Sequence, residues 1–153
     1  MSDEPAFRDA VEADLPAILA LLVDDVLGAA RDRLTDPIDA AYAKAFAAID
    51  ANPHDRLIVA ETEGAVVACA QLTILHGLSR RGATRGQIEG VRVASHLRGA
   101  GLGERLIRHC LAVAREKGCG LVQLTTDRSR TDAHRFYERL GFTPSHVGMK
   151  IVL

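Results

Sequence analysis

Six consecutive residues, Arg98-Gly99-Ala100-Gly101-Leu102-Gly103, have the composition of a loop that holds a phosphate group. Glycines let the backbone approach a ligand closely, and a helix that begins here presents N–H groups without intrahelical partners. Those N–H groups and the positive end of the helix dipole favour a phosphate or pyrophosphate. Because the apolar strand-like segment 87–93 precedes the loop, the sequence predicts that the chain binds a phosphorylated small molecule at the end of a strand.

Two well-known phosphate loops fit these surroundings poorly. A dinucleotide-binding fold places its glycines directly after a strand and an acidic residue about 20 residues later. Here residues 94–98 separate the strand from the glycines, and Asp127 lies too far along the chain. A Walker loop is excluded because no Gly-Lys-Ser/Thr follows. A nicotinamide-dependent enzyme therefore remains a weak hypothesis.

The elements that position this loop follow from the hydrophobic pattern of a chain long enough for one domain, residues 1–153. Glu63-Gly64 indicates a hairpin, and Asp14 is a plausible N-cap. We expect strands at 7–11, 57–62, 65–75, 87–93, 121–125 and 148–153. We expect helices at about 14–28, 36–51, 101–117 and 132–140. This order, β-α-α-β-β-β-α-β-α-β, predicts a mixed sheet in which the helix after Val93 joins parallel strands.

Composition excludes several classes of protein. The net charge of −1 gives no electrostatic footprint for nucleic acid or for an anionic membrane. No segment approaches the roughly 20 apolar residues of a membrane span, and the acidic start is unlike a signal peptide, so we expect a cytoplasmic protein. The cysteines, Cys69, Cys110 and Cys119, are odd in number and widely spaced. We therefore expect neither disulfides nor a metal site, and only Cys119 as a candidate exposed thiol.

Two linked stretches of sequence resemble the GNAT family of N-acetyltransferases, which bind acetyl-CoA. The first is Ile88-Glu89-Gly90-Val91-Arg92-Val93 with the glycine loop, similar to the family's strand and its Arg/Gln-x-x-Gly-x-Gly/Ala motif. The second is Ala133-His134-Arg135-Phe136-Tyr137-Glu138-Arg139-Leu140-Gly141-Phe142, similar to the family's late Ala-x-x-Phe-Tyr-x-x-x-Gly-Phe signature. The resemblance implies an α/β (α+β) fold, with a mixed, mostly antiparallel sheet flanked by helices.

The resemblance also implies which residues would bind each part of acetyl-CoA. Backbone N–H groups of Arg98, Gly99, Ala100, Gly101, Leu102 and Gly103 would hold the pyrophosphate of acetyl-CoA. The backbone of Val91, Arg92 and Val93 would pair with the pantetheine arm, and an N–H near Val91 would steady the acetyl carbonyl. Many relatives carry Asn where this chain has Arg130, which could instead meet a phosphate of the cofactor.

Tyr137 and Glu89 are the candidate acid and base. A tyrosine in this place protonates the departing thiolate in the family, and its ordinary pKa of about 10 suits a thiol. Glu89 would take a proton from the amine, directly or through a water, and burial of this face of the strand would raise its pKa towards a useful value. The alternative is an ordinary solvent-exposed glutamate, and the sequence leaves both open. His134 and His76 are weaker candidates for the base.

The sequence thus predicts an acyl-CoA-dependent N-acetyltransferase that uses direct transfer to an amine, with no metal. The alternative is a non-catalytic acetyl-CoA-binding sensor or interaction module. Acidic residues at 24–39 could attract a cationic amine, and Arg80, Arg81 and Arg85 could receive an acidic substrate or the cofactor's 3′-phosphate. The sequence does not choose between them. A homodimer is expected only from the habit of the family.

Overall fold

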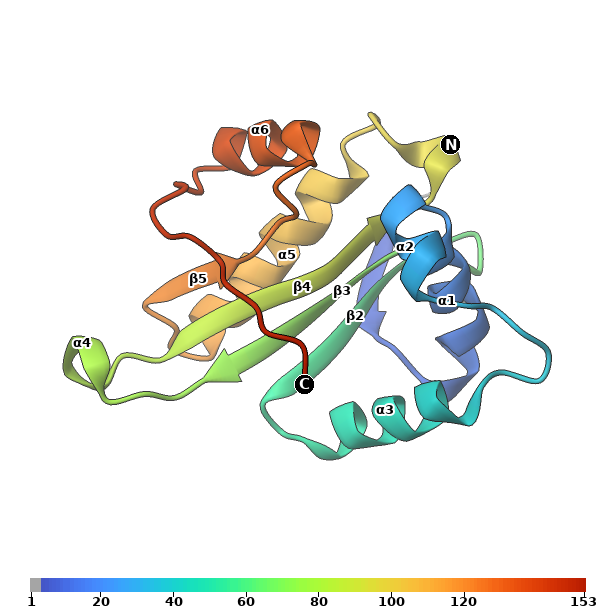
Figure 1. Ribbon diagram of the computed structural model, residues 1–153, viewed down its shortest axis with the longest axis horizontal. Helices are drawn as coiled ribbons and strands as arrows, with labels where there is room; N and C mark the ends of the chain where they lie inside the picture. Colours follow the sequence, from blue (N-terminus) through green and yellow to red (C-terminus); the bar gives the residue numbers. More distant parts are fainter. Residues whose placement is uncertain (1–3) are drawn as a thin grey trace. The chain divides into compact units, whose positions relative to one another are not determined.

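The structure is a computed structural model that describes residues 4–153, and among them five strands form one sheet in chain order (Figure 1). The strands are β1 Ala6–Asp9, β2 Asp55–Thr62, β3 Ala65–Leu75, β4 Arg85–Val93 and β5 Leu121–Leu124. The first three pairings are antiparallel. Along β4 and β5 the paired positions advance together, since Gly120 N–H donates to the Thr84 carbonyl at 2.8 Å and Gln123 Nε2 donates to Gln87 Oε1 at 3.1 Å. The expected mixed, mostly antiparallel sheet is confirmed.

The four expected helices are present, but the first is divided in two, and the short helix Ser79–Gly82 lies where no helix was predicted. They are α1 Leu15–Val23, α2 Val26–Arg31, α3 Ala40–Ala51, α4 Ser79–Gly82, α5 Leu102–Glu116 and α6 Thr131–Arg139. The single helix expected at 14–28 breaks after Val23, because the Asp25 side chain accepts a hydrogen bond from Gly28 N–H and starts α2. A Cβ on Gly28 would lie 1.8 Å from the Leu22 carbonyl oxygen, so this tight junction requires glycine. Helix α3 begins at Ala40 rather than near Pro37, since Asp39 caps it.

The two faces of the sheet differ in character where β3 meets β4. Leu72 and Ile88 are paired across the strands and fully buried. A Cβ built on nearby Gly86 would lie 3.3 Å from Leu72 Cδ1 and 3.4 Å from Ala114 Cβ on α5, which identifies this face as the one that packs against α5. The core face of α5 consists of Leu102, Leu106, Ile107, Cys110, Val113 and Ala114. On the opposite face, the neighbouring register pairs are Gln71 with Glu89 and Cys69 with Arg92.

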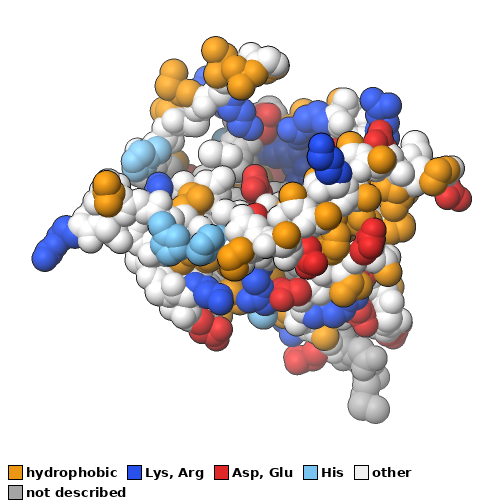
Figure 2. Space-filling view, turned by 90° about the horizontal axis from the view of Figure 1, so that it is seen from below, with side chains coloured by type: hydrophobic (Ala, Val, Ile, Leu, Met, Phe, Trp, Pro, Cys, Tyr) orange, Lys and Arg blue, Asp and Glu red, His pale blue; other side chains and the backbone are white. Residues whose placement is uncertain are grey.

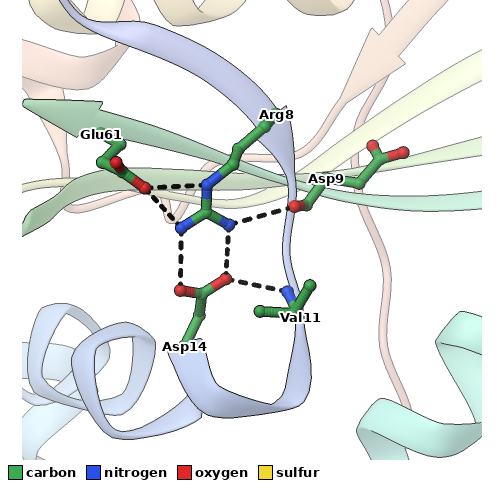
Figure 3. A network of polar contacts seen from close by, with 5 residues as sticks. All are labelled: Arg8, Asp9, Val11, Asp14 and Glu61. Atoms are coloured by element: carbon green, nitrogen blue, oxygen red, sulfur yellow. Dashed lines mark hydrogen bonds and ion pairs between the residues drawn. The ribbon is translucent and has the colours of Figure 1, made fainter. Parts of the chain in front are cut away.

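A cluster of charged residues fixes the connection from β1 to α1 (Figure 3). The Arg8 guanidinium donates to both carboxylate oxygens of Asp14, at 2.7 and 3.0 Å, and to Glu61 on β2. Asp14 also accepts from Val11 N–H at 2.8 Å. Asp14 therefore stands just before α1, as expected, but its side chain braces the turn instead of capping the helix. The Arg8 bonds hold the pKa of Asp14 below its usual range despite burial.

The chain forms two compact units, the first ending at Gln123 and the second covering Leu124–Leu153. The second unit contains α6, and its last residues correct one prediction. The strand expected at 148–153 is wrong: in this part of the described chain no residue has strand structure, and Met149, Ile151 and Leu153 are exposed. Their alternating apolar pattern is typical of a strand, yet a strand forms only where a neighbouring strand satisfies its backbone groups.

The three cysteines differ in burial. Cys69 and Cys110 are buried, as expected, whereas Cys119 is half-buried and burial raises the pKa of its thiol. Acidic and basic side chains both occur across the face shown in Figure 2. No helix within residues 4–153 is long and apolar enough to cross a membrane. Within the same residues, no three His, Cys, Asp or Glu side chains are grouped to hold a metal ion.

Candidate acetyl-CoA site

The glycine loop leads into α5 in a conformation that only glycine adopts readily. Gly99 and Gly101 have φ values of 81° and 85°, and Gly101 is the residue just before the first helical residue, Leu102. A Cβ added to either glycine would meet no described atom within 4 Å, so the space beside the backbone is open. The first-turn N–H groups of α5 have no intrahelical acceptor. The loop therefore has the donors and the clearance that a pyrophosphate needs.

Arg98 joins this loop to the end of α1. Its Nη2 donates to the Asp24 carbonyl at 2.8 Å, and its Nε donates to the Val93 carbonyl at 3.2 Å. The Asp24 carboxylate in turn accepts from Ser95 N–H at 3.3 Å. Because the guanidinium bonds two backbone carbonyls, Arg98 holds the position of the loop. Its Nη2 also forms an ion pair with the Asp24 carboxylate at 3.8 Å, and about half of its side chain stays exposed.

A β-bulge interrupts β4 directly before the loop. Cys69 pairs with Arg92 and Gln71 pairs with Glu89, so two residues, Gly90 and Val91, lie opposite Ala70 alone. Gly90 has a φ of 63°, which is the conformation expected for glycine at a bulge. A bulge shifts a strand out of its ladder and redirects its backbone groups. The backbone near Val91 is thus the part of β4 best placed to leave the sheet and meet a ligand.

Cys69 supports the bulge from the neighbouring strand. Its Sγ donates to the Gly90 carbonyl oxygen at 3.6 Å, and burial raises the pKa of the thiol to about 12. The thiol therefore stays protonated and acts as a hydrogen-bond donor rather than as a nucleophile. The sequence had indicated only a small buried hydrophobe here, because nothing in it showed that a bulge would lie opposite.

Glu89 lies on the polar face of β4 and is exposed, so the exposed alternative of the two considered is the one found. Next to it along the strand, Gln87 accepts from Gln123, whose own oxygen accepts from Arg85 Nη1 at 3.3 Å. Glu89 thus continues a row of polar side chains that faces away from α5, where water can reach its carboxylate.

The second unit contains Tyr137 and Arg130. Tyr137 is half-buried on α6, with its ring edge-on to Phe136 at 5.1 Å and to Phe142 at 5.7 Å between centroids. Arg130 is the residue just before α6. His134 Nε2 lies 2.9 Å from the Asp127 carbonyl oxygen, a contact that reduces its freedom to act as a base. The motif aromatic residues therefore pack together around the tyrosine.

Comparison with known proteins agrees with these features. The sequence profile described as "Acetyltransferase (GNAT) family" matches residues 19–142. The chain belongs to the GNAT family. A solved structure from Bacillus halodurans C-125, described as a transcriptional regulator, is 42% identical to this GNAT chain with a TM-score of 0.96, covering 98% of this chain and 100% of that one.

Two curated relatives of this GNAT chain are named N-acetyltransferases. Aminoalkylphosphonate N-acetyltransferase of Salmonella typhimurium is 35% identical over 69% of this chain and 68% of its own length. Glucosamine 6-phosphate N-acetyltransferase of Trypanosoma brucei brucei is 38% identical over 59% of each chain. The chain thus spans less than two thirds of the trypanosomal relative. Both names support assignment of this chain to the acetyltransferase enzymes.

The structure brings most of the predicted site residues together in the first unit. Glu89, Val91, Arg92, Val93 and the loop at 98–103 follow one another from β4 into α5, whereas Tyr137 and Arg130 belong to the second unit. The sequence reading missed the parts played by Asp24 and Asp25, which bond the loop and start α2. Two consecutive aspartates in the middle of a helical pattern were the available signal, since Asp favours helix starts over interiors.

Proposed function

We propose that this protein is an N-acetyltransferase that moves an acetyl group from acetyl-CoA directly to a primary amine. The observation that carries the proposal is the succession of a bulged β4 and a glycine loop that starts α5 within one short segment. Together these features offer a donor for a carbonyl oxygen and a cradle for a pyrophosphate.

The chain's own groups fit acetyl-CoA, which when bound supplies the activated acetyl thioester. The N–H groups from Arg98 to Gly103 would receive the pyrophosphate, and the half-exposed Arg98 charge would assist them. The backbone of Val91, Arg92 and Val93 would pair with the pantetheine arm. An N–H at the bulge would donate to the acetyl oxygen as negative charge grows on it, and such donors contribute about 3 kcal/mol. Arg130 would add a further positive charge toward the cofactor's phosphates.

Glu89 would act as the general base and Tyr137 as the general acid. The amine nitrogen forms a bond to the acetyl carbon as the carbon–sulfur bond breaks. Glu89, directly or through water, takes the proton that the nitrogen must lose, and exposure on the polar face gives water access to it. Tyr137 gives its phenol proton to the departing sulfur, so that the products are an amide and a free thiol. No covalent enzyme intermediate is needed.

The names of the relatives suggest the first acceptors to try. The Salmonella protein is named for aminoalkylphosphonates and the trypanosomal protein for glucosamine 6-phosphate. Both compounds join an amine to a phosphorus oxyanion. We therefore propose amines that carry a phosphate or phosphonate as the acceptor class for this chain.

A non-catalytic acetyl-CoA-binding module is the alternative, and replacing Tyr137 with Phe separates the two. For an enzyme we expect Tyr137→Phe to lower kcat by about a hundredfold or more, because a general acid contributes roughly that factor, with acetyl-CoA affinity preserved. Free thiol release reports turnover, and calorimetry reports binding. A native protein that binds acetyl-CoA but releases no thiol with any amine tested would support the module instead.

A further inference from the structure

Arg92, on the polar face of β4 next to the bulge, is a half-buried cation with few hydrogen bonds. Its side chain is 16% exposed. Nη1 donates to the carbonyl of its own neighbour, Val91, at 2.8 Å. Nη2 forms an ion pair with Asp25 Oδ2 at 3.7 Å, which is longer than a hydrogen bond. Nε is shielded from solvent and has no hydrogen-bond partner among the described residues.

Arg8 shows how this chain satisfies an arginine whose role is structural. Arg8 is more exposed than Arg92, at 37%, yet its guanidinium bonds Asp14, Glu61 and a backbone carbonyl. Buried donors without partners are costly, and a charged donor more so than a neutral one. The more buried arginine is therefore the one with fewer hydrogen bonds, and its ion pair with Asp25, at 3.7 Å, is longer than those of Arg8, at 2.7 and 2.6 Å.

We propose that Arg92 binds an oxyanion of the acceptor substrate, so that the amine accepted by this enzyme carries a carboxylate, phosphate or phosphonate. The Nε and Nη2 groups form the edge of a guanidinium that pairs with such an anion through two parallel hydrogen bonds. In Arg92, Nε has no hydrogen-bond partner among the described residues, and Nη2 forms a long ion pair with Asp25. This assignment rests on the proposed acetyltransferase function.

The position of Arg92 suits selection of an acceptor. Arg92 follows Val91, where the proposed donor to the acetyl oxygen lies, and its side chain faces the start of α2 through Asp25. An anion held here places a nearby amine close to the acetyl group. Because Nε is shielded, the anion reaches this edge only as neighbouring side chains give way, and the Asp25 carboxylate is the acidic group beside it.

The test compares matched acceptors in native protein and in arginine variants. O-phosphoethanolamine and β-alanine carry the two oxyanions, and ethanolamine and propylamine are the counterparts without an oxyanion. Thiol release from acetyl-CoA gives kcat/KM for each. Arg92→Gln removes the positive charge, and Arg92→Lys keeps the charge but lacks the planar guanidinium that donates two parallel hydrogen bonds. Arg108→Gln is the control, since Arg108 is an exposed arginine paired with Glu104 on α5. Calorimetric binding of acetyl-CoA reports whether each variant is folded.

We expect native protein to prefer at least one acceptor with an oxyanion over its counterpart without one by tenfold or more. That preference should fall at least tenfold in Arg92→Gln, partly return in Arg92→Lys and persist in Arg108→Gln. The acceptor that is preferred tells a carboxylate from a phosphate. Three results would overturn the assignment. They are equal kcat/KM for acceptors with and without an oxyanion, a preference that survives Arg92→Gln, and acetyl-CoA binding without turnover of any acceptor. Failure of native protein to bind acetyl-CoA would instead contradict the proposed function.

Discussion

The two faces of β4 carry opposite kinds of residue at neighbouring positions. Ile88 is 1% exposed and packs with Leu72 on the face against α5. Glu89, the next residue, is exposed on the other face, in line with Gln87 and Gln71. One strand thus anchors the core with one face and presents polar groups with the other, so stability and chemistry can be changed separately along it.

The bulge marks the point where this division changes. Before it, strict alternation sends even-numbered residues of β4 into the core. Past Gly90 and Val91 the register shifts by one residue. Arg92 therefore lies on the polar face, paired with Cys69 of β3. A single extra residue in β4 thus lets the strand expose backbone groups beside the glycine loop while its other face stays in the core.

The largest expected effects on stability and on turnover come from replacing, one at a time, two adjacent residues on opposite faces of β4. Ile88→Ala should cost about 3 kcal/mol of unfolding free energy, since it leaves a cavity in the core under α5. Glu89→Gln should change stability by less than about 0.5 kcal/mol but lower turnover by about a hundredfold. Urea unfolding and thiol release measure the two quantities. If Glu89→Gln loses stability but not activity, the division between the faces is wrong.

A smaller effect distinguishes strain from function at the bulge. Gly90 and Gly64 both have positive φ, at 63° and 77°, and a Cβ on either meets no described atom within 4 Å. Each Gly→Ala change should therefore cost about 1–2 kcal/mol of stability through backbone strain alone. Only Gly90→Ala should also lower acetyl transfer, because Gly64 lies in the hairpin between β2 and β3. Equal loss of activity in both variants would remove the bulge from the site.

The smallest expected effect is a pH dependence of the free energy of unfolding, caused by His109 on α5. His109 on α5 stacks on Phe7 of β1 at 4.9 Å, and burial, aided by Arg56, lowers its pKa although Asp9 and Glu116 oppose this. Below about pH 6.5 the unfolded chain takes up a proton that the folded chain resists. Stability should therefore fall as pH drops through this range, by less than about 1.4 kcal/mol per pH unit. Unfolding of His109→Phe should lack that slope, whereas an unchanged slope would assign it to other groups.

The sequence predicted best what local pattern controls. Apolar, partly β-branched runs and the Glu63-Gly64 turn located β2 and β3, and the apolar stripe with its glycine start located α5 within a residue. The glycine loop was predictable because its conformations require glycine. Local pattern and backbone chemistry were sufficient for these elements.

Features that depend on distant contacts were not predictable. The break between α1 and α2 depends on Asp25 and on the approach of Gly28 to Leu22. The bulge depends on how β4 registers against β3, and the exposure of Glu89 follows from that register. The apolar pattern at 148–153 predicted a strand that the structure lacks in this described segment, because alternation alone does not supply a partner.

Thermal unfolding with saturating acetyl-CoA, and with NAD as the comparison ligand, measures whether this chain binds the cofactor expected of it. If the bulged strand and the glycine loop hold acetyl-CoA, ligand at a hundred times its Kd should add about 2.7 kcal/mol and raise the unfolding midpoint clearly. NAD should leave the midpoint unchanged. A midpoint that does not respond to acetyl-CoA, or that responds to NAD alone, would contradict this account.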